Sequence, residues 1–180
     1  MSNHDCHGHH DSYRYGVSQS LDELAFEKGI WGAALDGNVE KLKSILSRGE
    51  DPSICDPSGY TALHYAARNG KEDICKILLE HGANPNAQTH GGATPLHRAA
   101  FVGHANVVSL LLRNYANPCL CDSDKMTALH KAAERLHFEV CQMLVTAKPE
   151  LLNMKDKNDL KPFQYVKENN VCLLSLLNPA

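Results

Sequence analysis

The sequence predicts an all-α solenoid, in which short helix-turn-helix repeats stack along one axis. The main observation is a tetrapeptide that recurs every 33 residues, and a fixed period of this length is typical of repeat architectures. The residues that follow each copy carry an apolar stripe at helical spacing, and strand patterning is poor. The three copies are Thr61-Ala62-Leu63-His64, Thr94-Pro95-Leu96-His97 and Thr127-Ala128-Leu129-His130.

Aligning the chain on this period predicts five repeats. The first is degenerate, with Trp31 in place of the histidine, and the last is truncated, with Lys161-Pro162-Phe163-Gln164 in the tetrapeptide column. Degenerate ends are expected because a terminal repeat turns one face to water. The expected domain is 20–178, with repeats at about 25–54, 58–87, 91–120, 124–153 and 158–178.

Before the repeats, residues 1–19 are polar, rich in histidine and without period, so we expect a disordered tail. Ser20-Leu21-Asp22-Glu23 has the capping-box pattern, a serine with a glutamate three residues later. A lead-in helix is therefore expected to start there and to cover the open side of the first repeat.

Each column of the repeat has a physical reason. Paired alanines, as in Ala66-Ala67, allow neighbouring helices to approach closely. Gly70 and Gly103 occupy the place where the short helix ends, which favours positive φ, and Leu136 takes that place in the fourth repeat. Either that helix end relaxes, or Leu136 is strained by about 1–2 kcal/mol. The turns between repeats are marked by Asp56, Asp122 and Asp156.

The period and the TALH or TPLH block resemble the ankyrin repeat. The resemblance implies a scaffold whose partners contact the turn tips and the outward face of the first helices. We therefore expect a non-catalytic protein-binding module. Phe101 and Val102 are apolar in columns that are polar in the second and fourth repeats, and aromatic and arginine side chains dominate binding hot spots. The expected partner-binding residues are Tyr65, Arg68, Arg98, Phe101, Val102, Lys131, Glu134 and Arg135.

Composition narrows the classes of ligand. The net charge of −3 argues against nucleic acid as the main ligand, and the absence of an 18-residue apolar run argues against a membrane span. Seven cysteines without a secretion signal suggest a reducing compartment. We expect an intracellular protein, cytoplasmic or nuclear, that is a monomer, has a protein partner, uses no cofactor and has no enzyme activity.

Two groups of residues invite a metal hypothesis. The histidines of the tetrapeptides lie one repeat apart, too far to share an ion, so we expect them to hydrogen-bond turn backbone instead. The tail is the alternative site, since metal binding there would make this a metal-regulated protein. Its possible ligands are His4, Cys6, His7, His9 and His10.

Overall fold

The computed structural model describes residues 26, 29–167 and 169–178. Over this part of the chain all named elements are helical, and the only β pairing is one isolated bridge between Cys55 and Thr61. The α-helices are α2 (Ile30–Asp36), α3 (Val39–Ser47), α4 (Ala62–Arg68), α5 (Glu72–Glu80), α6 (Pro95–Val102), α7 (Ala105–Arg113), α8 (Ala128–Glu134), α9 (Phe138–Ala147) and α10 (Val171–Leu177). The 3₁₀-helices are η1 (Pro149–Asn153) and η2 (Pro162–Tyr165). The predicted all-α solenoid is confirmed.

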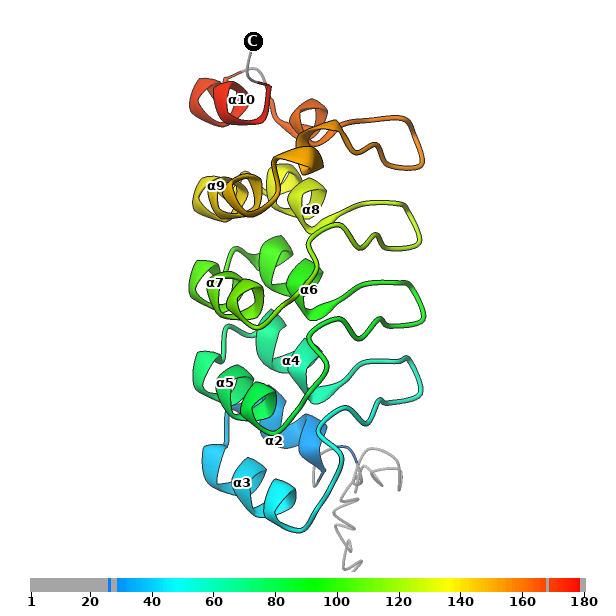
Figure 1. Cartoon of the computed structure of the whole chain (residues 1–180), viewed down its shortest axis with the longest axis vertical. Helices are drawn as coiled ribbons and strands as arrows, with labels where there is room; N and C mark the ends of the chain where they lie inside the picture. Colours follow the sequence, from blue (N-terminus) through cyan, green and yellow to red (C-terminus); the bar gives the residue numbers. More distant parts are fainter. Residues whose placement is uncertain (1–25, 27–28, 168, 179–180) are drawn as a thin grey trace, which may run out of the picture.

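The repeats stack as a ladder with three parallel rows (Figure 1). One row contains α2, α4, α6 and α8, and a second row contains α3, α5, α7, α9 and α10. The third row consists of finger loops, the hairpin-like turns that project from the helices between successive repeats. Because neighbouring repeats repeat the same contacts, each row continues from one end of the ladder to the other.

Small residues bring the first helices of neighbouring repeats together. Both alanines of each pair, such as Ala66 and Ala67, are fully buried. The second helices contribute the larger apolar side chains, and Leu78, Leu111 and Leu144 share one column and are fully buried. Burying a leucine side chain stabilises the fold by about 1.5–3 kcal/mol, so this column is a main part of the core.

The finger loops are shaped by the aspartates that the sequence marked as turns. Asp56 Oδ1 accepts hydrogen bonds from the backbone N–H groups of Ser58 (2.8 Å) and Tyr60 (2.9 Å). Asp122 and Asp156 repeat this pattern in the fourth and fifth repeats. In the third repeat the turn uses Thr89, whose Oγ1 accepts from the N–H of Ala93 at 3.2 Å. The fingers are therefore hydrogen-bonded turns.

The short helices end as predicted, in left-handed backbone. Gly70 has φ of +65° and Gly103 has φ of +94°. Leu136 takes the same conformation with φ of +62°. Of the two alternatives that the sequence left open for Leu136, the structure has the strained one.

The fifth repeat closes the ladder with a reduced pair, the 3₁₀-helix η2 followed by α10. The predicted lead-in helix from Ser20 and the tail at 1–19 lie outside the described residues. None of the described helices combines the length and the apolar character needed to cross a bilayer.

Candidate functional site

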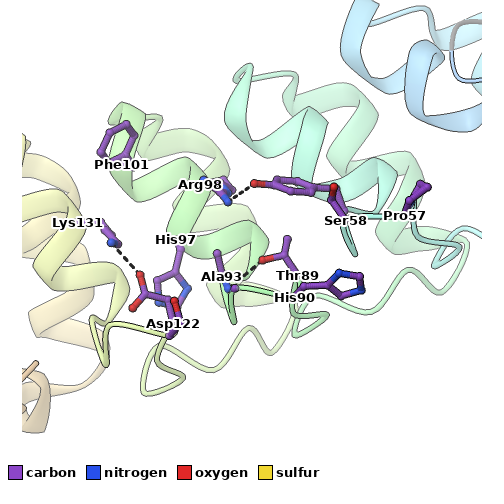
Figure 2. Close-up of a pocket in the computed structure, with 13 residues that line it drawn as sticks. Pro57, Ser58, Thr89, His90, Ala93, His97, Arg98, Phe101, Asp122 and Lys131 are labelled. Atoms are coloured by element: carbon purple, nitrogen blue, oxygen red, sulfur yellow. Dashed lines mark hydrogen bonds and ion pairs between the residues drawn. The ribbon is translucent and has the colours of Figure 1, made fainter. Parts of the chain in front are cut away.

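An open groove lies between the fingers and the first helices of the middle repeats (Figure 2). It encloses about 570 Å³. Its lining comes from three successive repeats, with finger residues on one side and residues of α6 and α8 on the other. The lining residues are Pro57, Ser58, Tyr60, Thr89, His90, Gly91, Ala93, His97, Arg98, Phe101, Asp122, Ser123 and Lys131.

The tetrapeptide histidines tie each first helix to the next finger. Nε2 of His64 lies 3.0 Å from the carbonyl oxygen of Ala93, and Nε2 of His97 lies 2.9 Å from that of Met126. Because a carbonyl oxygen can only accept, Nε2 carries the proton. Nδ1 then accepts from the threonine three residues earlier, for His97 from the N–H of Thr94 at 3.2 Å. His130 makes the same bridge to Leu160, so the predicted backbone role of these histidines is confirmed.

Burial keeps these rings neutral. It lowers the pKa of His64 from 6.5 to about 4, and it also lowers the pKa values of His97 and His130. A neutral ring can accept at one nitrogen while it donates at the other, which is what each bridge requires. Each of the three rings is hydrogen-bonded to a different backbone carbonyl. The described residues contain no group of three or more His, Cys, Asp or Glu that could hold a metal ion. The expected ligands of the tail lie outside the described residues.

Arg98 lies on the wall of the groove, where it stacks on Tyr60. Its guanidinium carbon is 4.9 Å from the centre of the Tyr60 ring, a cation–π distance. One terminal nitrogen, Nη2, donates to the Tyr60 hydroxyl, as the dashed line in Figure 2 shows. The Nε–H is buried and has no hydrogen-bond partner among the described residues. Arg98 also forms none of the ion pairs seen in the described part of the chain.

The other charges of the groove neutralise each other. Lys131 Nζ lies 2.8 Å from Asp122 Oδ2, and both side chains are largely buried. Burial alone would raise the pKa of Asp122, but hydrogen bonds from Lys131 and from the N–H of Met126 lower it below its usual range. Asp122 is therefore ionised. Its carboxylate forms an ion pair with Lys131 and accepts hydrogen bonds from the backbone of its own finger.

Phe101 stands at the end of the groove away from the fingers (Figure 2). The guanidinium carbon of Arg135, from the next repeat, lies 4.2 Å from the centre of the Phe101 ring. Phe101 is half-buried and Arg135 is exposed, so this contact stays at the surface. The sequence grouped these two residues on one face, and the structure places one against the other.

The structure brings together only part of the set expected from the sequence. Arg98, Phe101 and Lys131 line the groove, and Arg135 joins them through Phe101. Tyr65 is half-buried and donates its hydroxyl to Asp56 Oδ2 at 2.6 Å, so it supports a finger. The other three residues are exposed at the ends of first helices and line none of the groove: Arg68, Val102 and Glu134.

A second set of histidine bridges was not predicted. Nε2 of His104 lies 3.1 Å from the carbonyl oxygen of Arg68, and Nε2 of His137 lies 3.2 Å from that of Phe101. A Cβ atom built on Gly103 would lie only 2.5 Å from the His137 ring. His104 and His137 are 33 residues apart, so the sequence contained a signal from which this second set could have been predicted. Gly103, at the end of a short helix, leaves room for the His137 ring of the following repeat.

Comparison with known families agrees with this geometry. A family model for ankyrin repeats in three copies matches residues 30–120, and a model for ankyrin repeats in many copies matches residues 113–145. The chain belongs to the ankyrin-repeat family. Ankyrin repeats are generally protein-protein interaction modules, which assigns the broad class of function without naming a partner.

Similar segments occur in proteins of different kinds. Ankyrin repeat domain-containing protein 39 from Homo sapiens is 53% identical over 60 residues, and its counterpart from Bos taurus has the same identity and length of match. Each match covers 33% of this chain and 33% of the relative. Potassium channel KOR2 from Oryza sativa subsp. japonica is 43% identical over 53 residues, which is 29% of this chain and 7% of the channel. The ankyrin repeats alone therefore do not decide what the whole protein does.

Proposed function

We propose that this chain is a non-catalytic adaptor that binds a protein partner on its concave face, made by the finger tips and the first helices. The observation that carries the proposal is the groove, which joins a finger wall to Arg98 and Phe101 of α6 and to Lys131 of α8. The proposed contact residues are those expected from the sequence, namely Tyr65, Arg68, Arg98, Phe101, Val102, Lys131, Glu134 and Arg135.

Rigidity of the groove supports this proposal. Hydrogen bonds from backbone N–H groups to the Asp56 and Asp122 carboxylates hold two fingers, and His64 and His97 hold fingers against first helices. A surface that is already in its binding conformation avoids part of the ordering cost of association. We expect little backbone change when the partner binds.

The chemistry of the groove also fits a protein surface. Aromatic and arginine side chains supply most hot spots in interfaces, and Tyr60, Arg98 and Phe101 all line the groove. The described residues contain six cysteines, all free thiols. From these thiols we infer that the protein is intracellular, either cytoplasmic or nuclear. We propose residues 20–178 as the binding domain.

Phe101→Ala tests the proposal. We expect this variant to weaken binding of a partner captured from cells by about 2 kcal/mol or more, as for a hot-spot residue. The thermal midpoint, measured on the same sample, should change little, because Phe101 is only half-buried. Unchanged affinity with a lowered midpoint would show that Phe101 is a packing residue and that recognition occurs elsewhere.

Tyr115→Ala is the matched control. It also replaces an aromatic side chain by alanine, at a residue that is 89% exposed and lies beyond α7, outside the groove. Capture by this variant should equal that of the wild type. Equal losses in both variants would contradict a site on the concave face.

A further inference from the structure

We propose that the groove selects an acidic–apolar segment of a protein partner, with an Asp or Glu side chain on Arg98 and an apolar side chain on Phe101. This inference rests on the proposed function and specifies the chemistry of the partner. It follows from the charge balance of the groove, from the hydrogen bonds of Arg98 and from the exposed apolar residues beyond Phe101.

Charge balance gives the sign of the ligand. With histidines counted as neutral, the lining residues contain two cations, Arg98 and Lys131, and one carboxylate, Asp122. Lys131 and Asp122 form an ion pair at 2.8 Å. One positive charge therefore remains without a counter-charge in the groove, although the whole chain has a net charge of −3. That charge belongs to Arg98.

The hydrogen bonds of Arg98 give the kind of ligand group. A guanidinium has five N–H donors in a fixed fork, which matches the two oxygens of a carboxylate. In the described structure one nitrogen donates to the Tyr60 hydroxyl, while the buried Nε–H has no partner. The other terminal N–H groups of the guanidinium have no acceptor among the described residues, and a carboxylate that enters the groove supplies one.

The far end of the groove combines the Phe101 ring with two exposed apolar side chains, and the guanidinium of Arg135 lies over the ring. Phe101 lines it, and beyond it Val102 and Leu136 are each 39% exposed. His137 donates to the carbonyl oxygen of Phe101, so the turn that carries Leu136 lies against the end of α6. An apolar side chain of the partner gains contact area here, against Phe101 and its exposed apolar neighbours.

The spacing of the two subsites predicts a motif. Arg98 and Phe101 are three residues apart on α6, which places their Cβ atoms about 5–6 Å apart. In an extended peptide, residues i and i+2 are on one side and about 6.6–6.8 Å apart. An extended segment therefore reaches both subsites with an acidic and an apolar residue separated by one residue, in either order.

A single guanidinium favours a carboxylate over more strongly charged groups. Nucleic-acid backbones are bound by several Lys or Arg side chains that neutralise successive phosphates, and the second cation of this groove is occupied by Asp122. A phosphoserine carries about −1.5 to −2 charges, more than Arg98 alone balances, and Arg135 lies over Phe101 at the other end of the groove. We therefore assign the site to Asp or Glu side chains.

Peptide selection tests the inference with a defined probe. Random 12-residue peptides, amidated at the C-terminus, are selected on the full chain, and the best binders are synthesised. We expect enrichment of an acidic residue two positions from an apolar one. Changing that Asp or Glu to its amide should weaken binding about tenfold, equivalent to 1.4 kcal/mol, with the loss increasing at low salt.

Arg98→Gln completes a double-mutant cycle. Against this variant the acid-to-amide change in the peptide should have less than a twofold effect, because the partner of the carboxylate is gone. Arg113→Gln is the matched control, since it removes an exposed arginine of α7 outside the groove. This control should keep the tenfold preference. Because the peptide is also varied, the result does not depend on the stability of the Arg98 variant alone.

Three other outcomes each overturn the inference. In the first, the selected peptides need Phe101 but show no preference for an acidic residue, or they keep that preference with Arg98→Gln. This result would remove the role of Arg98 and leave the proposed function standing. Peptides that bind only with a free C-terminus, or at least tenfold tighter as phosphoserine versions, assign the site to those groups instead. A selection that yields no Phe101-dependent peptide overturns the proposed function together with the inference.

Discussion

Lowering the pH from 7 to 5 should destabilise the repeat stack through His64. This ring is fully buried between Thr61 and the carbonyl oxygen of Ala93, and its burial lowers its pKa from 6.5 to about 4. The unfolded chain binds a proton at His64 at higher pH than the folded chain does. The contribution of the neutral ring is therefore present above pH 6.5 and is lost as the pH falls toward 4.

The size of the effect follows from these two pKa values. One pKa unit corresponds to 1.36 kcal/mol, so a shift from 6.5 to about 4 gives a limit of about 3 kcal/mol. Between pH 7 and pH 5 the expected loss from His64 alone is about 2 kcal/mol. The pKa values of His97 and His130 are lowered in the same direction and add to it. Asp122 acts in a lower window, since its contribution is lost only below its ordinary pKa of 3.8.

Urea unfolding, followed by far-UV circular dichroism at half-unit steps from pH 7.5 to 4.5, measures this dependence. His64→Gln should be less stable at pH 7, and its unfolding should take up about one proton fewer between pH 6 and 5. Cys75→Ala is the control. Burial raises the pKa of the Cys75 thiol to about 12, so the thiol is neutral throughout, and its loss should lower stability by about 1 kcal/mol without changing the pH slope.

Two results would refute the reasoning. A free energy of unfolding that stays constant between pH 7 and 5 would mean that His64 is protonated in the folded state with little cost. A slope in His64→Gln equal to that of the wild type would assign the pH dependence to other groups.

The remaining predictions use the same stability assay. His97→Ala should cost about 1–3 kcal/mol, because it leaves the buried N–H of Thr94 without a partner, whereas the carbonyl of Met126 keeps the N–H of Asp122; metal content should not change, and loss of bound zinc would contradict the backbone role. Leu136→Gly should be neutral or stabilising, because it relieves positive φ at a residue that is 39% exposed; a loss above about 2 kcal/mol would identify Leu136 as a core residue. Gly103→Ala, the reverse change in the same column, should destabilise by more than about 1 kcal/mol, because its Cβ meets the His137 ring at 2.5 Å, and an unchanged midpoint would show that the ring moves away freely.

The proposed contact residues show which features of the site could be predicted from the sequence and which could not. The sequence placed Arg98, Phe101 and Lys131 on the outward face of the first helices, and all three line the groove. It did not predict that Lys131 pairs with Asp122, which leaves Arg98 as the charge without a partner. It also did not predict that the hydroxyl of Tyr65, another proposed contact residue, donates to Asp56. The position of a residue in the repeat predicts the helix face on which it lies. It does not predict which atoms its side chain contacts.

The sequence by itself determined the features that depend on local hydrogen bonds and on the period. These are the number and order of the helix pairs, the aspartate turns of the fingers and the left-handed ends of the short helices. They are readable because each arises within a few residues, or from residues that occupy the same column of successive repeats.

Only the tertiary structure decided the contacts between repeats. Arg98 meets Tyr60 across 38 residues, His137 meets the carbonyl of Phe101 across 36, and Arg135 covers the Phe101 ring. The tertiary structure also decided the backbone conformation of Leu136, since the sequence allowed either a relaxed or a strained helix end. Such contacts follow from the offset between stacked repeats and from the rotamers that close packing permits, and a one-dimensional pattern of columns contains neither.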